Sequence, residues 1–158
     1  MNSAAPLFAQ SDVLLDVELL NKQALFEAVG SMWASHRGVT ANEVVDSLNA
    51  REKIGSTGLG QGVAIPHARV NGLTEAIAAF VRPKTAIQFD SPDGMPVAFC
   101  LVLLVPAPAT EQHLRTLSDI ASMLSSVQFR DQLGRAKNAD EVHHLFATWH
   151  NTIIAKAA

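Results

Sequence analysis

The most informative stretch of the chain is Arg51–His67, which reads REKIGSTGLGQGVAIPH. It places four glycines within eight residues, follows them with a short apolar run, and ends on a histidine directly after a proline. Glycines at this density allow positive φ and a close approach of the backbone to a ligand. Pro66 fixes its own φ and favours an extended Ile65. We therefore expect His67 to lie at the end of a strand, beside a loop rich in backbone N–H groups where an anion can be held.

The spacing of these glycines does not fit a nucleotide-binding loop. A P-loop carries Lys and Ser/Thr directly after its second glycine, whereas Gln61 and Gly62 follow Gly60 here. A dinucleotide fingerprint lies between a strand and a helix, and the order expected here is helix, loop, strand. Nucleotide binding is therefore not expected. Two interpretations stay open: a loop that holds an anion, and a tight connection that needs glycine only for its backbone.

Composition indicates an ordinary globular protein. The 158 residues are 48% hydrophobic and 17% charged, with a formal net charge of −3, which is not the composition of a disordered chain. No basic patch for nucleic acid is evident. We expect one domain covering residues 1–158, because this length buries a core on both faces of a sheet.

The sequence predicts a soluble, cytoplasmic protein that is not membrane-embedded. Met1–Gln10 lack a basic segment followed by a long apolar core, so no signal peptide is expected. The longest apolar run, Val97–Val105, is well short of the ~20 residues of a membrane-spanning helix. Cys100 is the only cysteine, which excludes an internal disulfide and fits a reducing compartment.

Apolar periodicity and capping residues predict five helices. Thr40 with Glu43, and Asn138 with Glu141, form the pattern of a capping box. A strongly amphipathic helix follows Pro108, with Leu114 and Leu124 at opposite ends of its apolar face. The five predicted helices cover residues 22–36, 40–53, 110–126, 128–136 and a last segment that begins at 138.

About five strands are predicted between these helices. Residues 97–105 form a continuous apolar run, typical of a strand buried on both faces, and Pro106 ends it. A turn at Pro92-Asp93-Gly94 indicates a hairpin. The other predicted strands cover residues 13–17, 63–65, 75–81 and 86–89. We expect an α/β fold, with a mixed β-sheet flanked by helices on both faces.

Two of the six histidines stand out by position. His67 follows a strand and a proline, and His113 lies in the first turn of a helix, just beyond a strand end, where sites gather in α/β sheets. A neutral imidazole is nucleophilic near pH 7 and can accept a phosphoryl group. The remaining histidines fit surface or helix-end positions, and no zinc-type spacing is present; these are His36, His143, His144 and His150.

A phosphorylated imidazole needs nearby donors or cations. Arg51, directly before the glycine loop, is the candidate cation. An alternative stays open, in which Arg51 only stabilises the C-terminus of the preceding helix through its dipole.

The whole pattern from Arg51 to His67, together with Leu103-Leu104-Val105-Pro106-Ala107 and His113-Leu114, closely resembles the fructose/mannitol-type EIIA domains of the bacterial phosphotransferase system. Within that family, the stand-alone nitrogen-regulatory members are the most similar. The resemblance covers nearly the whole chain and implies a mixed sheet between helices, without a metal or other cofactor. One departure is Ala68-Arg69, where relatives often carry Gly and Lys, and Arg69 keeps the positive charge.

The resemblance also implies roles for individual residues. His67 would accept a phosphoryl group at Nε2 from an HPr-like phosphocarrier protein. His113 would orient the ring or bind the phosphoryl group, and Arg51 would neutralise its charge. The phosphoryl-site loop would comprise Ser56, Thr57, Gly58, Gly60 and Gly62.

The sequence is compatible with three functions. The first is a regulatory phosphocarrier whose phosphorylation state controls targets such as sensor kinases or potassium transporters. The second is a sugar-transport EIIA that passes the phosphoryl group to a sugar-specific EIIB. The third is a binding module that holds an anion without chemistry.

Overall fold

The computed structural model describes residues 12–108 and 110–157, with side chains described as far as Trp149. The expectation for Met1–Gln10 therefore lies outside the described residues. Eleven elements follow one another along the chain: β1 (Val13–Val17), α1 (Lys22–His36), α2 (Ala41–Ile54), β2 (Gly58–Gly60), β3 (Val63–Ala64), β4 (His67–Val70), β5 (Ile77–Pro83), β6 (Phe99–Pro106), α3 (Glu111–Ser125), α4 (Val127–Arg135) and α5 (Ala139–Ala157).

The sheet is mixed and is organised around β6. The strand order is β1-β5-β6-β3-β2, and β4 also pairs with β6. β6 is antiparallel to β5 and parallel to both β3 and β4, which occupy successive positions along the same side of it. β1 confirms the strand predicted over residues 13–17, and it runs parallel to β5 at the sheet's edge.

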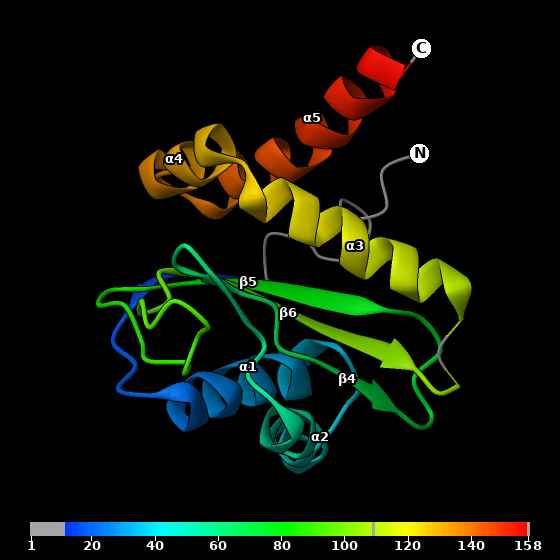
Figure 1. The fold of residues 1–158 in the computed structure, drawn as a ribbon. Coiled ribbons are helices and arrows are strands. Elements are labelled where there is room, and N and C mark those ends of the chain that lie inside the picture. Colours follow the sequence, from blue (N-terminus) through cyan, green and yellow to red (C-terminus); the bar gives the residue numbers. More distant parts are fainter. Residues whose placement is uncertain (1–11, 109, 158) are drawn as a thin grey trace.

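Two hydrophobic clusters lie on opposite faces of this sheet. β5 and β6 are buried almost throughout, as a strand covered on both sides must be. One cluster joins the sheet to α1 and α2 through residues such as Trp33 and Leu48. The other joins it to α3, α4 and α5 through residues such as Ile120 and Phe146. Figure 1 shows these two layers of helices with the sheet between them.

The predicted helix starts are confirmed at the level of hydrogen bonds. Thr40 Oγ1 accepts from the Glu43 N–H at 3.1 Å, and the Glu43 carboxylate returns a contact to the Thr40 N–H at 3.5 Å. Asn138 Oδ1 accepts from the Glu141 N–H at 2.9 Å. Each cap satisfies a donor that the first turn of a helix leaves without a partner.

The α/β prediction is confirmed, with six strands among the described residues in place of about five. β2 and β4 were missed. β2 is a run of three residues with a glycine at each end, and β4 alternates polar and apolar residues over only four positions directly after a proline. The predicted hairpin is smaller than expected: it consists of one antiparallel bridge between Ile87 and Val97, outside the named strands. Cys100 is fully buried in β6, and burial raises the pKa of its thiol.

Of the helices in the described part of the chain, none combines the length and the apolar character needed to cross a membrane.

Candidate functional site

His67 and His113 line the same cleft, although 46 positions separate them in the sequence. The cleft has a volume of about 610 Å³ and lies where α2, β4, β6 and the first turns of α3 meet. Its walls combine basic and imidazole groups with apolar side chains, and none of the described residues that line it is acidic. They are Ser47, Ala50, Arg51, Ile54, His67, Ala68, Arg69, Leu103, Val105, His113, Leu114 and Leu117.

His67 is the first residue of β4 and lies opposite Leu103 in the middle of β6. The prediction placed it at the end of a strand. Instead, Ile65 and Pro66 connect β3 to β4, and the Pro66 carbonyl accepts from the Leu103 N–H at 2.9 Å. This bond and the strand pairing fix the backbone from which the imidazole projects.

The Ile65 carbonyl determines the protonation pattern of the His67 ring. Its oxygen lies 2.8 Å from His67 Nδ1. A carbonyl can only accept, so Nδ1 must carry the proton. In the neutral ring Nε2 then holds the free electron pair. Nε2 is therefore the ring atom that is available to act as a nucleophile or to accept a hydrogen bond.

The surroundings of His67 keep its ring neutral near pH 7. Partial burial lowers the pKa of His67, and the bond to the Ile65 carbonyl opposes this by raising it. The charges of Arg51 and Arg69 lower the pKa further, whereas Glu52 raises it. The net effect is a lowered pKa of His67. The neutral ring is therefore already populated at a pH where an ordinary imidazole is still protonated.

His113 occupies the third position of α3 and takes part in its cap. Its Nδ1 lies 3.0 Å from the Thr110 backbone N–H, and its own N–H donates to Thr110 Oγ1 at 3.4 Å. Because Nδ1 accepts, the neutral ring carries its proton on Nε2. His113 thus has the opposite tautomer to His67 and offers a donor. The sequence did not indicate this cap, because histidine stands where a capping box normally carries Glu or Gln.

Arg51 fits both interpretations that the sequence left open. Its Nη1 donates to the Gly55 carbonyl at 2.8 Å, which satisfies an acceptor at the C-terminus of α2. It also lines the cleft and acts electrostatically on His67. Arg69, from β4, is a second cation in the cleft wall.

The glycine loop divides between two locations. Ser56 and Thr57 line a second cavity, of about 340 Å³, together with Arg51 and His67. The glycines of the loop instead build the β2–β3 hairpin, where Gly60 and Gly62 have φ of 87° and 82°. Neither set of lining residues includes Gly58, Gly60 or Gly62. This arrangement favours the tight-connection interpretation for these three glycines.

Three exposed apolar side chains surround His67. Ile54 is 82% exposed, Leu114 61% and Leu59 46%. Ile54 lines the larger of the two cavities beside the ring, Leu59 the smaller, and Leu114 both. Leu114 was predicted on the apolar face of its helix, which would place it against the core. The first turn of α3 extends beyond the second cluster, so Leu114 faces the cleft.

The other histidines lie elsewhere. His36 is exposed at the C-terminal end of α1, as expected, and its Nε2 lies 2.7 Å from the buried carboxylate of Asp12. His143 and His144 lie on α5 and line a different cavity. The side chain of His150 is outside the described residues.

The fold and the cleft define an α/β protein that presents two histidines among cations and exposed apolar side chains. The sequence model described as "Phosphoenolpyruvate-dependent sugar phosphotransferase system, EIIA 2" matches residues 6–149. The chain belongs to this family.

Individual relatives agree with this assignment. A nitrogen regulatory protein of Pseudomonas aeruginosa is 42% identical over 111 residues, which cover 70% of this chain and 72% of that protein. The crystal structure of the nitrogen regulatory protein IIA-Ntr from Neisseria meningitidis has a TM-score of 0.86 at 41% identity, covering 90% of this chain and 97% of that one. The IIA mannitol structure from Escherichia coli has a TM-score of 0.71 at 17% identity, covering 88% and 98%, and shows the fold alone.

Proposed function

We propose that this protein is a phosphocarrier of the nitrogen-regulatory branch of the phosphotransferase system. In this proposal His67 accepts a phosphoryl group from a phosphohistidine of an HPr-like protein in the cytoplasm. The whole chain, residues 1–158, acts as one EIIA domain. The observation that carries the proposal is the neutral His67 ring with its free electron pair on Nε2, in a cleft shared with His113, Arg51 and Arg69.

The transfer step needs little from the protein beyond positioning and charge. The electron pair on His67 Nε2 forms the new N–P bond as the donor's N–P bond breaks, and the released pair stays on the donor imidazole. The proton on His67 Nδ1 stays on the ring during this step and remains hydrogen-bonded to the Ile65 carbonyl. Arg51 and the His113 Nε2–H stabilise the phosphoryl oxygens.

The rim of the cleft suits a small donor protein. Ile54, Leu59 and Leu114 are exposed around a reactive ring, where apolar contacts hold a partner without covering much surface. An encounter of this kind is transient and has a small interface.

The regulatory function is favoured over sugar transport by the relatives. At 41–42% identity the relatives described above carry the name nitrogen regulatory protein or IIA-Ntr, whereas the mannitol-specific structure is only 17% identical. We therefore propose that phosphorylation, which adds roughly two negative charges at pH 7, changes the binding of regulatory target proteins.

The proposal is tested by incubating the protein with a phosphorylated HPr-like donor and measuring its intact mass. We expect one added phosphoryl group on the wild type and none on His67→Ala. His36→Ala is the matched control and should be modified like the wild type, because His36 contacts Asp12 outside the cleft.

Two results would decide against the proposal. Equal phosphorylation of wild type and His67→Ala would place the phosphoryl group elsewhere, and the absence of uptake would leave an anion-binding module. Rapid onward transfer to a sugar-specific EIIB would favour the sugar-transport function instead.

A further inference from the structure

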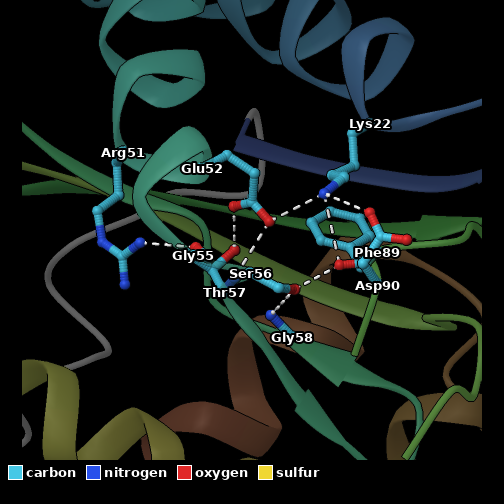
Figure 2. A network of polar contacts seen from close by, with 9 residues as sticks. All are labelled: Lys22, Arg51, Glu52, Gly55, Ser56, Thr57, Gly58, Phe89 and Asp90. Atoms are coloured by element: carbon cyan, nitrogen blue, oxygen red, sulfur yellow. Dashed lines mark hydrogen bonds and ion pairs between the residues drawn. The ribbon is translucent and has the colours of Figure 1, made fainter. Parts of the chain in front are cut away.

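A network of polar contacts lies behind the cleft and centres on Glu52 (Figure 2). The Glu52 side chain is 8% exposed and forms an ion pair with Lys22 Nζ at 3.2 Å. Its two oxygens also hold Thr57: Oε1 accepts from the backbone N–H at 3.1 Å, and Oε2 accepts from the hydroxyl at 2.6 Å. Arg51, the preceding residue, points to the other side of the helix end (Figure 2).

This network continues from Thr57 to the reactive ring. The Thr57 carbonyl accepts from the Ile65 N–H at 3.1 Å, and the Ile65 carbonyl lies 2.8 Å from His67 Nδ1. Three consecutive hydrogen-bonded links therefore join the Glu52 carboxylate to the proton that determines the tautomer of His67.

Thr57 is held on its other side as well. The Ser56 hydroxyl donates to the Phe89 carbonyl and accepts from the Gly58 N–H at 3.0 Å. Thr57 itself is 4% exposed. A buried peptide fixed from both sides has little freedom to move, and it passes this constraint to the Ile65 peptide that it binds.

We infer that Glu52 is a positioning residue for His67, which holds the Ile65 carbonyl on Nδ1 through Thr57 and so keeps the electron pair on Nε2. The inference rests on the proposed function for its effect on phosphoryl transfer, but the effect on the ring exists without any donor. Lys22 neutralises the carboxylate, so that a nearly buried charge is tolerated in this position.

The position and chemistry of Glu52 distinguish this role from a purely structural one. A structural contact would stabilise the loop and leave the protonation of His67 unchanged. Removal of a positioning contact, in contrast, changes which nitrogen of the His67 ring carries the proton. The tautomer of His67 is therefore the decisive quantity, in the way that a group behind a metal-bound histidine fixes its tautomer.

The test is ¹⁵N NMR of the ring nitrogens of His67 in the full-length protein, at a pH where the ring is neutral. We expect the Nδ1–H tautomer to predominate in the wild type. Glu52→Ala should give a mixture of both tautomers and slow phosphoryl uptake roughly ten- to a hundredfold, as loss of an orienting partner does elsewhere. Glu52→Gln keeps an acceptor for Thr57 and should stay close to the wild type in tautomer.

A second pair of variants covers the case in which Glu52→Ala does not fold. Thr57→Val removes the hydroxyl that binds Glu52 and should move the tautomer in the same direction, whereas Thr57→Ser should restore it. Asp93→Asn is the matched control, because Asp93 also binds backbone N–H groups of the glycine hairpin, those of Gln61 and Met95, but is not linked to His67 by this route.

An unchanged tautomer in folded Glu52→Ala, or in Thr57→Val if Glu52→Ala is unfolded, would overturn the inference. An equal change in Asp93→Asn would also overturn it, because the effect would then be a general response of the hairpin. If the tautomer depends on Glu52 but the wild type accepts no phosphoryl group, the positioning role stands and the proposed function fails.

Discussion

The two histidines of the cleft carry their protons on opposite nitrogens, and backbone groups set both. The Ile65 carbonyl holds the proton of His67 on Nδ1, and the Thr110 N–H occupies Nδ1 of His113. One ring therefore offers an electron pair and the other a donor, which are the two parts that transfer to a histidine requires. The sequence singled out both residues by their place at element boundaries, but hydrogen bonds to the backbone determine which ring nitrogen carries the proton.

The pH dependence of phosphoryl acceptance follows from the lowered pKa of His67. The neutral ring is the nucleophile, so we expect the rate to rise with pH along a single titration whose midpoint lies below about 6.5, the value of an ordinary imidazole. The ring's Hε1 shift, followed by NMR against pH, should give the same midpoint. A midpoint above 6.5 would contradict the account.

The same shift predicts how stability changes with pH. A lowered histidine pKa means that the unfolded chain binds a proton more readily than the folded chain. The contribution of His67 to the free energy of unfolding is therefore complete above about pH 6.5, and it is lost as the pH falls through the pKa of the folded state. Urea unfolding of wild type and His67→Gln at several pH values isolates this contribution. Below pH 6.5 the wild type should lose more unfolding free energy than His67→Gln, because only the wild type carries the imidazole.

Arg51 connects a helix end to the chemistry, so its removal should have two effects of different size. Arg51→Ala should slow phosphoryl uptake at least tenfold, because a cation near the transferred group is lost. It should lower the free energy of unfolding by only about 0.5 kcal/mol, the usual effect of a cation at a helix C-terminus.

Arg135→Ala is the control for this prediction. Arg135 forms an exposed pair with Asp131 within α4, at 3.0 Å, and we expect its removal to leave the uptake rate unchanged. Equal rates for the wild type and Arg51→Ala would mean that Arg51 serves the helix alone.

At the scale of elements, the glycine loop is a tight hairpin whose residues serve different purposes. Gly58 packs so closely against the segment that contains Ser91 that an added Cβ would lie 2.2 Å from Ser91 Oγ. Gly55 has open space around the same position and an extended φ of 169°. The density of glycines in the sequence could not distinguish these cases, because the difference depends on Ser91, a residue distant in the chain.

Two alanine substitutions separate these glycines. Gly58→Ala should lower the free energy of unfolding by about 1–3 kcal/mol, as overpacking typically does. Gly55→Ala should change it by less than about 1 kcal/mol, and in the stabilising direction, since alanine restricts the unfolded chain. Urea unfolding measures the free energy of unfolding of both variants. Equal destabilisation would contradict the conclusion that only Gly58 is closely packed.

Sequence patterns failed to predict two strands, β2 and β4, and β4 is the one that carries His67. β4 alternates polar and apolar residues over only four positions, which is too short a run to predict a strand, and a proline directly precedes it. It is a strand because β6 is long enough to pair with β3 through Phe99 and Cys100 and again with β4 from Leu103 onwards. The helices and β6 were predictable since their caps and apolar periods are local.

Across the whole molecule, two layers of helices enclose the sheet (Figure 1). The central strand β6 pairs with β4, the strand that begins at His67. α2 contributes Ile54 and α3 contributes Leu114, so the two faces of the sandwich supply opposite sides of one rim. A partner that docks on this rim contacts both layers. Sequence patterns place apolar residues on a helix face, but they do not show where that face extends beyond the core.

Docking on the rim can be tested with a charge at an exposed position. Leu114→Asp should raise the KM for the phosphorylated donor about tenfold and leave kcat largely unchanged, because it removes apolar contact with the partner and none with the reacting atoms. Val127→Asp is the matched control: Val127 is 71% exposed but begins α4, away from the cleft. Similar kinetics for the two variants would argue against this docking surface.

The most direct test of the central claim is ¹⁵N and ³¹P NMR of the protein after reaction with a phosphorylated HPr-like donor. We predict one phosphoryl group, bound to Nε2 of His67, because the Ile65 carbonyl occupies the Nδ1–H side of the ring. A phosphoryl group on Nδ1, or on any other histidine, would contradict the account.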